Sequence, residues 1–327
     1  MVDLSKTAVI IPTVRNYKII SDYVKNAEEN KFDTSKLFFI LVTENGCDIQ
    51  GMKTILKDCG VEGEVYDQTE RDRWFSDNNL SSFSDIIPKR SHAETSFGLL
   101  RILKDDFDNG IFIDDDTVPE SNDYFGLHMK NLNFEGGVNE LSSDKQWVNV
   151  LHRNFQTHKL YPRGYPYSCM NEKITTGKKD IKDVVLSQGL WTGVPDLDAV
   201  RILMEGDLTG RSLTRTQLND FGDNFIAANG NCLTVCSMNL AFRKEIIPAF
   251  YQLPMDDNSW KIGRFDDIWS GIIAKKVCDI LGKNIITGAP LCIHNKAERS
   301  TFKDLLAEVP ALELNEHLWN ILGQMKL

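Results

Sequence analysis

The fold is decided by residues 7–43, which read TAVIIPTVRNYKIISDYVKNAEENKFDTSKLFFILVT. Residues 7–11 and 37–43 are short apolar runs rich in β-branched and aromatic side chains, which is typical of buried parallel strands. Between them, apolar residues recur at helical spacing over residues 17–30, and Asn16 is placed to cap that helix. This segment therefore predicts a strand, a helix and a second strand.

The chain continues in the same alternating pattern for about a third of its length. Residues 52–59 predict a helix, residues 63–66 a third strand, residues 94–103 another helix and residues 110–113 a fourth strand. The pattern predicts an α/β fold with a Rossmann-like parallel sheet, which binds ligands at the carboxyl ends of its strands. The polar segment 67–90 is interpreted as a long loop over that site.

After residue 122 the pattern changes to shorter strands and turns. The elements expected there are strands at 147–151, 226–235, 284–287 and 291–293, an amphipathic helix at 268–281 and a helical tail at 302–327. No linker or internal repeat separates the two patterns. We therefore expect one domain over residues 1–327, with a nucleotide-binding half at 1–120, a sugar or acceptor half at 121–300 and a C-terminal tail at 301–327.

The composition narrows the class of ligand. The chain of 327 residues carries a formal net charge of -10, which disfavours nucleic acid as a partner but still permits a small anion bound through a divalent cation. Seven scattered cysteines argue against a disulfide framework, and Cys232 and Cys236 are interpreted as buried thiols. The polar start, without an apolar signal segment, and the lack of a membrane-length apolar run predict a cytoplasmic protein with no membrane span.

Three consecutive aspartates, Asp114, Asp115 and Asp116, directly follow the fourth apolar strand. Like charges held this close raise one another's pKa, and a divalent cation such as Mg²⁺ or Mn²⁺ relieves the repulsion. In this interpretation Asp116 binds the metal, Asp114 contacts ribose or a metal-bound water, and Asp115 orients both. The alternative is a solvated acidic turn.

His294 follows a late strand and is a second candidate metal ligand, although a single histidine is more often structural. Lys296, two residues later, is a candidate for binding phosphate or is simply solvated.

Other polar residues follow the first two strands. Pro12, Thr13, Arg15 and Asn16 combine a hydroxyl, a guanidinium and a helix N-terminus, which suits a diphosphate or a base edge; a helix cap beside a surface arginine is the alternative. Glu44 is a weaker candidate for contact with the base or ribose. Asp77, in the predicted loop, is weaker still.

The segment 161–168, YPRGYPYS, holds Arg163 between two prolines and a glycine, which predicts a rigid turn. It is either a sugar-binding or diphosphate-binding element or a stiff surface loop. Asp266 and Asp267 start the helix predicted after residue 265, so they either cap that helix or act on the sugar as a general base.

Several longer motifs resemble the reversibly glycosylated polypeptide family in sequence and in order. They are YPRGYPYS at 161–168, LSQGLWTGVPDLDA at 186–199, VCSMNLAFRKEIIPA at 235–249, IGRFDDIWSG at 262–271 and IHNKA at 293–297, with IDDD at 113–116 upstream. The resemblance implies a GT-A-like fold, Mn²⁺ or Mg²⁺ as cofactor, and interconversion of the pyranose and furanose rings of UDP-arabinose. It places the metal aspartates at 114–116, the glycosylated arginine at Arg163, the late histidine at His294 and the paired aspartates at Asp266 and Asp267.

The same resemblance leads us to assign Trp191, in the second motif, to the substrate-binding set. Segments 67–90 and 168–182 and the tail after 297 depart from the plant pattern, which leaves the sugar and a possible homo-oligomer open. The sequence thus predicts a metal-dependent UDP-sugar mutase in which Arg163 is either a nucleophile or a diphosphate clamp. The alternatives are a glycosyltransferase with a separate acceptor and a non-catalytic partner subunit.

Overall fold

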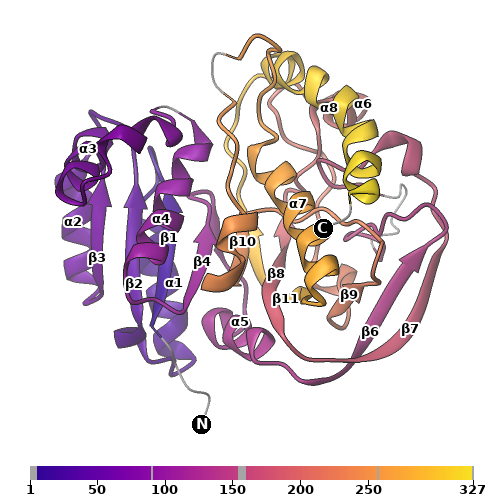
Figure 1. Cartoon of the computed structure of the whole chain (residues 1–327), viewed down its shortest axis with the longest axis horizontal. Helices are drawn as coiled ribbons and strands as arrows, with labels where there is room; N and C mark the ends of the chain where they lie inside the picture. Colours follow the sequence, from indigo (N-terminus) through magenta and orange to yellow (C-terminus); the bar gives the residue numbers. More distant parts are fainter. Residues whose placement is uncertain (1–5, 90, 154–159, 256–257, 326–327) are drawn as a thin grey trace.

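The computed structural model describes residues 6–89, 91–153, 160–255 and 258–325. Some segments with a prediction extend into residues that are not described. These residues are 1–5, Arg90 and 326–327. The first half alternates strands and helices, as predicted except for α3: β1 (Thr7–Pro12), α1 (Ile19–Glu29), β2 (Leu37–Val42), α2 (Ile49–Asp58), β3 (Glu62–Tyr66), α3 (Gln68–Asp77), α4 (Ser96–Lys104) and β4 (Asn109–Ile113). Figure 1 shows this half as the indigo and purple layer of the molecule.

The second half adds short helices and longer strands. Its elements are β5 (Thr117–Pro119), α5 (Tyr124–Leu132), β6 (Gly136–Ser143), β7 (Ile174–Ile181), β8 (Val184–Gly193), α6 (Ala199–Met204), β9 (Phe225–Ala227), β10 (Asn239–Arg243), α7 (Asp266–Leu281), β11 (Asn284–His294) and α8 (Thr301–Gln324). In Figure 1, α7 and α8 lie over this half of the sheet, with α6 beside α8.

One sheet runs through both halves. Within the described residues it has eleven strands in the order β3-β2-β1-β4-β10-β8-β11-β9-β6-β7, with β5 paired to β11. The first four strands are parallel, and β10 is antiparallel to both β4 and β8. Because β11 is parallel to β8, the strands β4, β8 and β11 all end at the same edge of the sheet. The α/β class and the mixed central sheet expected for a GT-A-like fold are therefore confirmed.

The core of the first half explains why these segments form strands and helices. Residues 8–11 of β1 are fully buried, and β1 aligns Ala8 with Gly110 of β4 and Val9 with Phe39 of β2. α1 covers this sheet with one apolar face, which includes Ile20 and Tyr23. Burying such apolar surface stabilises the fold by ~25 cal/mol per Å².

Several predicted elements differ in detail. Segment 67–89 is not a long loop: it contains α3, which Asp67 caps by accepting from the backbone N–H of Glu70 at 2.9 Å. Asn16 does not cap α1, because the helix starts at Ile19 with Lys18 as its N-cap residue and no capping side chain. The expected strand at 147–151 is reduced to an isolated bridge between Trp147 and Cys232.

Three further predictions need correction in the second half. Only residues 226 and 227 of the expected strand at 226–235 belong to a strand, β9, because a turn follows at residues 229–230. The two strands expected at 284–287 and 291–293 form the single strand β11. α7 is not a simple amphipathic helix, because residues 266–272 are all buried and it lies inside the molecule. No helix in the described ranges is long and apolar enough to cross a bilayer, and all seven cysteine thiols are free.

Candidate functional site

The shared edge of β4, β8 and β11 gathers the predicted polar residues. Asp114–Asp116 follow β4, Val194–Asp196 follow β8, and Lys296 lies just after the end of β11 at His294. These segments are about 80 to 180 residues apart in sequence, so only the strand order brings them together. The carboxyl ends of such strands are where open α/β sheets bind ligands.

Asp115 connects the acidic strand end to the loop after β1. Its Oδ2 accepts from Thr13 Oγ1 at 3.0 Å, and its Oδ1 lies 4.0 Å from Arg15 Nη2. Arg15 is largely exposed, so the guanidinium can reach a ligand above the strand ends. Three predicted residues, Thr13, Arg15 and Asp115, are therefore brought together.

Asp116 and His294 form the next pair. Asp116 Oδ2 lies 3.6 Å from His294 Nε2, and His294 Nδ1 lies 2.7 Å from the carbonyl oxygen of Val194. A carbonyl oxygen only accepts, so Nδ1 carries a proton and Nε2 is the nitrogen left to face the carboxylate. Burial would raise the pKa of Asp116, but the hydrogen bond with His294 holds it below its ordinary value. The pair is arranged to share a proton or a cation.

Asp114 lies beside a residue that the sequence did not single out. His92, which begins the short 3-10 helix His92–Thr95, places Nε2 3.4 Å from Asp114 Oδ1 and Nδ1 3.6 Å from Asp266 Oδ2. Burial opposes its charge, but hydrogen bonds to both carboxylates raise the pKa of His92 well above its ordinary value. Burial raises the pKa of Asp114, whereas for Asp266 the hydrogen bond from His92 outweighs burial and lowers it. His92 thus bridges the strand end and the start of α7.

Arg163 lies in the rigid turn that its neighbours predicted. Gly164 has φ +87°, and a Cβ there would come within 2.2 Å of Ile268 Cγ2, so only glycine fits. The Arg163 side chain is 9% exposed, which makes this segment part of the interior and not a surface loop.

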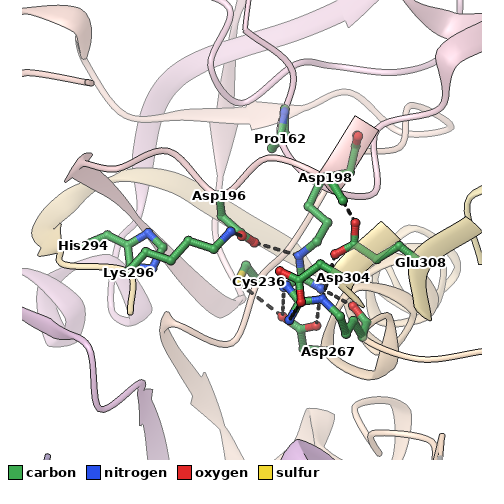
Figure 2. A network of polar contacts seen from close by, with 12 residues as sticks. Pro162, Asp196, Asp198, Cys236, Asp267, His294, Lys296, Asp304 and Glu308 are labelled. Carbon is green, nitrogen blue, oxygen red and sulfur yellow. Dashed lines mark hydrogen bonds and ion pairs between the residues drawn. The ribbon is translucent and has the colours of Figure 1, made fainter. Parts of the chain in front are cut away.

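The Arg163 guanidinium is held on several sides, and Figure 2 labels two of its partners, Asp196 and Asp267. Its Nε donates to Asp196 Oδ2 at 2.9 Å, and its Nη1 and Nη2 each lie 3.4 Å from a carboxylate oxygen of Asp267. Nη1 also donates to the carbonyl oxygen of Arg264. Burial lowers the pKa of Arg163, but Asp196 and Asp267 more than reverse this and raise it well above its ordinary value.

The consecutive residues Asp266 and Asp267 serve different neighbours. Asp266 faces His92, whereas Asp267 faces Arg163 and also accepts from Cys236 Sγ at 3.3 Å. Both carboxylates are buried at the start of α7, so they do more than cap a helix at the surface. Together they link the acidic strand end with the arginine.

Asp196 is the second residue that the sequence reading missed. It is 5% exposed and pairs with both Arg163 and Lys296, whose Nζ lies 3.2 Å from Asp196 Oδ1. Burial would raise the pKa of Asp196, but the two cations hold it far below its ordinary range. Lys296 is therefore not solvated; burial lowers its pKa even beside Asp196. The available signal was an aspartate three residues after the end of β8.

The side chains of the remaining predicted residues have no described hydrogen bond or ion pair to this cluster. Pro12 ends β1 and is half-buried, and Asn16 is exposed in the loop before α1. Glu44 is half-buried after β2, and Asp77 is exposed at the end of α3, where no described hydrogen bond or ion pair joins it to the strand ends. Trp191 is 2% exposed within the main core, and its indole N–H has no hydrogen-bond partner in the described structure.

The metal site can be judged from the donor atoms. Among the described residues, no three His, Cys, Asp or Glu side chains are arranged to hold a metal ion together. The predicted set of Asp114, Asp116 and His294 is thus brought together only in part, since Asp114 turns to His92. Asp116 and His294 remain a suitable pair, because Mg²⁺ or Mn²⁺ takes few protein ligands and completes its shell with water and phosphate oxygens.

Comparisons with known proteins find relatives that are similar over nearly the whole chain. A "Probable UDP-arabinopyranose mutase 1" of Pisum sativum is 26% identical over 321 residues, covering 95% of this chain and 75% of the relative. "UDP-arabinopyranose mutase 1" of Arabidopsis thaliana is 25% identical over 330 residues, covering 98% and 79%. A solved structure of the mannosyltransferase PcManGT from Pyrobaculum calidifontis in complex with GDP-Man and Mn2+ aligns with a TM-score of 0.42 at 12% identity, covering 98% of this chain and 73% of that one.

The family profile of the reversibly glycosylated polypeptide matches residues 9–327. The match spans both halves of the sheet and includes Asp114–Asp116, Arg163, Asp266, Asp267 and His294. The chain belongs to the reversibly glycosylated polypeptide family.

Proposed function

We propose that this chain is a metal-dependent UDP-sugar mutase that interconverts the pyranose and furanose forms of a sugar such as arabinose. The observation that carries the proposal is the buried Arg163, held between Asp196 and Asp267. Asp267 is adjacent in sequence to Asp266, which His92 connects to Asp114 at the acidic strand end. A diphosphate at the strand ends and a sugar over the arginine would fit this order of residues.

The nucleotide half would hold UDP. Asp116 and His294 are the proposed ligands of Mn²⁺ or Mg²⁺, which when bound neutralises the diphosphate so that UDP leaves more readily. Thr13 and Arg15 lie beside Asp115 and would contact the diphosphate or the ribose. Pro12, Asn16 and Glu44 remain candidates for the nucleotide, as does Trp191 for the sugar.

Arg163 would take the sugar from UDP. A lone pair on one of its terminal nitrogens forms a bond to C1 while the C1–O bond to the diphosphate breaks and its electrons leave with UDP. The raised pKa of Arg163 opposes this attack, so the proton must leave the nitrogen as the bond forms. Asp267, 3.4 Å away, is the proposed acceptor.

The ring change would follow on the bound sugar. The nitrogen lone pair opens the six-membered ring by breaking the C1–ring oxygen bond, and the ring oxygen takes a proton. The neighbouring hydroxyl then adds to C1, loses its proton and closes a five-membered ring. UDP oxygen displaces Arg163, and Asp267 returns the proton to the guanidinium. Atoms and charge balance over the cycle without an external acceptor.

Arg163→Ala tests the covalent step. Purified protein is incubated with UDP-arabinopyranose and Mn²⁺ without any acceptor, and the pyranose and furanose products are separated by chromatography. We expect the variant to lose interconversion, whereas Arg73→Ala, an exposed arginine on α3, keeps it. Interconversion by Arg163→Ala at a near wild-type rate would exclude the arginine as nucleophile.

Metal use is tested by binding as well as by activity. Asp116→Asn and His294→Gln should each weaken Mn²⁺ binding, measured by calorimetry with UDP present, whereas the exposed Asp58→Asn should leave it unchanged. Chelation of the wild type should abolish conversion, and Mn²⁺ should restore it. Unchanged affinity in both variants would move the metal away from this pair.

A glycosyltransferase with a separate acceptor is the second candidate. It is favoured by the pairing of Arg163 with two carboxylates and its raised pKa, which suit a fixed cation that binds a diphosphate. The acceptor-free assay separates the two functions, because a transferase leaves the ring form of the nucleotide sugar unchanged.

A further inference from the structure

The C-terminal helix α8 buries a stripe of mostly polar residues, while several of its apolar residues are exposed. Its buried residues are Thr301, Asp304, Glu308, Ala311 and Asn315, which recur at three- and four-residue spacing along one face. Its exposed residues include Phe302 at 57% exposed, Leu306 at 76% and Val309 at 47%. A surface helix normally buries its apolar stripe, so the polar stripe of α8 needs partners inside the molecule.

Glu308 is the centre of the buried stripe. Its carboxylate is almost fully buried; Oε1 accepts from Arg264 Nε at 2.7 Å, and Oε2 accepts from the backbone N–H of Ala199 at 2.7 Å. Asp304, one turn earlier, lies 3.3 Å from Arg264 Nη1. Figure 2 shows both carboxylates of α8 beside the network around Asp267. Two carboxylates from one helix thus hold the Arg264 side chain.

Arg264 is connected directly to Arg163. Its backbone is in the left-handed region, with φ +62°, which an arginine adopts only when its surroundings hold it there. Its carbonyl oxygen accepts from Arg163 Nη1. The chain of contacts therefore runs from Glu308 through the side chain and carbonyl of Arg264 to the arginine proposed to react.

α8 also holds the turn that carries Arg163 from its other side. Asn315 Nδ2 donates to the carbonyl oxygen of Gly164 at 2.7 Å, and Asn315 Oδ1 accepts from Trp269 Nε1 at 3.2 Å. Glu316 accepts from the backbone N–H groups of Tyr167 and Ser168 at 2.6 and 2.9 Å. Helix α8 thus fixes the backbone of the turn that carries Arg163. It also fixes Arg264, whose carbonyl oxygen contacts the Arg163 guanidinium.

We infer that α8 positions Arg163 for reaction, with Glu308 as the positioning residue that acts through Arg264. This inference rests on the proposed mutase function only for its activity readout. If α8 served stability alone, it would not need its buried charges, because replacing a buried charge pair with packed apolar residues often leaves stability unchanged or higher. The retained charges instead fix one geometry of Arg264, and hence one position of Arg163 Nη1.

We expect removal of the Glu308 carboxylate to lower turnover without weakening the binding of Mn²⁺ and UDP. Without the Glu308 carboxylate, Asp304 alone holds the Arg264 side chain from α8, so we expect the Arg264 backbone to relax from its left-handed conformation and its carbonyl to move away from Arg163. A misplacement of a reacting atom by about 1 Å costs on the order of 100-fold in rate. Asp116, His294, Thr13 and Arg15 do not contact α8 through the bonds described above, so binding of Mn²⁺ and UDP is unaffected.

Glu308→Leu and Glu308→Gln test this, with Glu313→Leu, an exposed position on the same helix, as the matched control. We expect Glu308→Leu to lower kcat roughly 100-fold with KM and the affinity for UDP and Mn²⁺ within about twofold. Glu308→Gln keeps the shape and the acceptor to one N–H, so it should recover about tenfold of that loss. Glu313→Leu should behave as wild type.

A second readout separates this inference from the mutase proposal. The Arg163 Nε–H resonance, assigned in ¹⁵N-labelled protein by its loss in Arg163→Lys, should shift in both Glu308 variants and stay in place in Glu313→Leu. A wild type without ring interconversion but with this shift would overturn the mutase function and support the positioning role. Wild-type kcat and an unmoved Arg163 resonance in Glu308→Gln would overturn the positioning role, even if Glu308→Leu fails to fold.

Discussion

Two regions of the molecule place polar groups near strand ends, but the residues that support those groups differ in kind. Around β1 and β4 the supporting residues are apolar and fully buried, such as Val9, Ile10 and Ile111. Around Arg163 the supporting residues are themselves charged and almost as deeply buried. The region around β1 and β4 is therefore held by apolar packing, and the region around Arg163 by matched charges.

This difference determines how each half responds to change. A large-to-small substitution in an apolar core lowers the free energy of unfolding roughly in proportion to the volume removed, and the remaining contacts persist. Removing one charge from a buried network lowers the free energy of unfolding more, because the partner of that charge stays buried without a compensating charge. The four changes below test this contrast.

Asp196→Asn is expected to have the largest effect. It removes the charge that faces both Arg163 and Lys296, so two buried cations lose their shared carboxylate. The free energy of unfolding should fall by about 4 kcal/mol, measured by urea denaturation, and ring interconversion by roughly 100-fold. The exposed Asp58→Asn is the control. Wild-type stability in Asp196→Asn would show that packing, not charge, holds this half.

Ile111→Ala tests the packed half. Ile111 is fully buried between β1 and β10, where it aligns with Val9 and Ala241. We expect a loss of about 3 kcal/mol in the free energy of unfolding by urea denaturation, since the cavity cannot fully collapse, with KM and kcat near wild type in the folded protein. A loss of turnover larger than the loss of folded protein would contradict the separation of the two halves.

The pH dependence of stability tests a different kind of buried polar group, the histidine His128. His128 of α5 is fully buried, with Nδ1 3.0 Å from Ser187 Oγ and Nε2 2.9 Å from Asn239 Oδ1, and burial lowers its pKa to about 3. The unfolded chain therefore binds the extra proton as pH falls below about 6.5, so this stability is present at neutral pH and lost in acid.

The expected size is about 2 kcal/mol between pH 7 and pH 5, measured as the change in the free energy of unfolding. His128→Gln cannot take up a proton, so its stability should fall less over the same range. Parallel curves for the two proteins would mean that other groups set the acid response.

Asp48→Ala is expected to have the smallest effect. Asp48 caps α2 by accepting from the backbone N–H of Gly51 at 2.9 Å, at an exposed site far from any buried charge pair. The loss should be about 1 kcal/mol in thermal or urea unfolding, with unchanged activity. A loss comparable to that of Asp196→Asn would remove the contrast between exposed and buried carboxylates.

The same contrast explains which parts of the fold could be predicted. β1, β2 and β4 were predicted because each is an apolar run with no polar interruption. α3 was missed because Gln68–Asp77 has only a narrow apolar face, although Asp67 followed three residues later by Glu70 is a recognisable helix start. The cap is recognisable in the sequence, but the weak helical periodicity led to the prediction of a loop.

The site divides in the same way. The aspartates at 114–116 could be proposed from their position after a buried strand, and their pairing with Thr13 and His294 follows from the strand order. His92 and Asp196 could not, because their partners lie at least 22 residues away and no local pattern marks a buried ion pair. Long-range charge matching is decided by tertiary structure and leaves no periodic signal.

The inward-facing carboxylates of α8 also affect the order in which the molecule is completed during translation. The ribosome makes the acidic strand end nearly two hundred residues before it makes Glu308. A nascent chain that stops before residue 301 can already pair β1, β2 and β4, yet it lacks the groups that hold Arg264 and the Arg163 turn. The region around β1 and β4 is thus expected to form early, and the surroundings of Arg163 are completed only when the final helix folds back onto them.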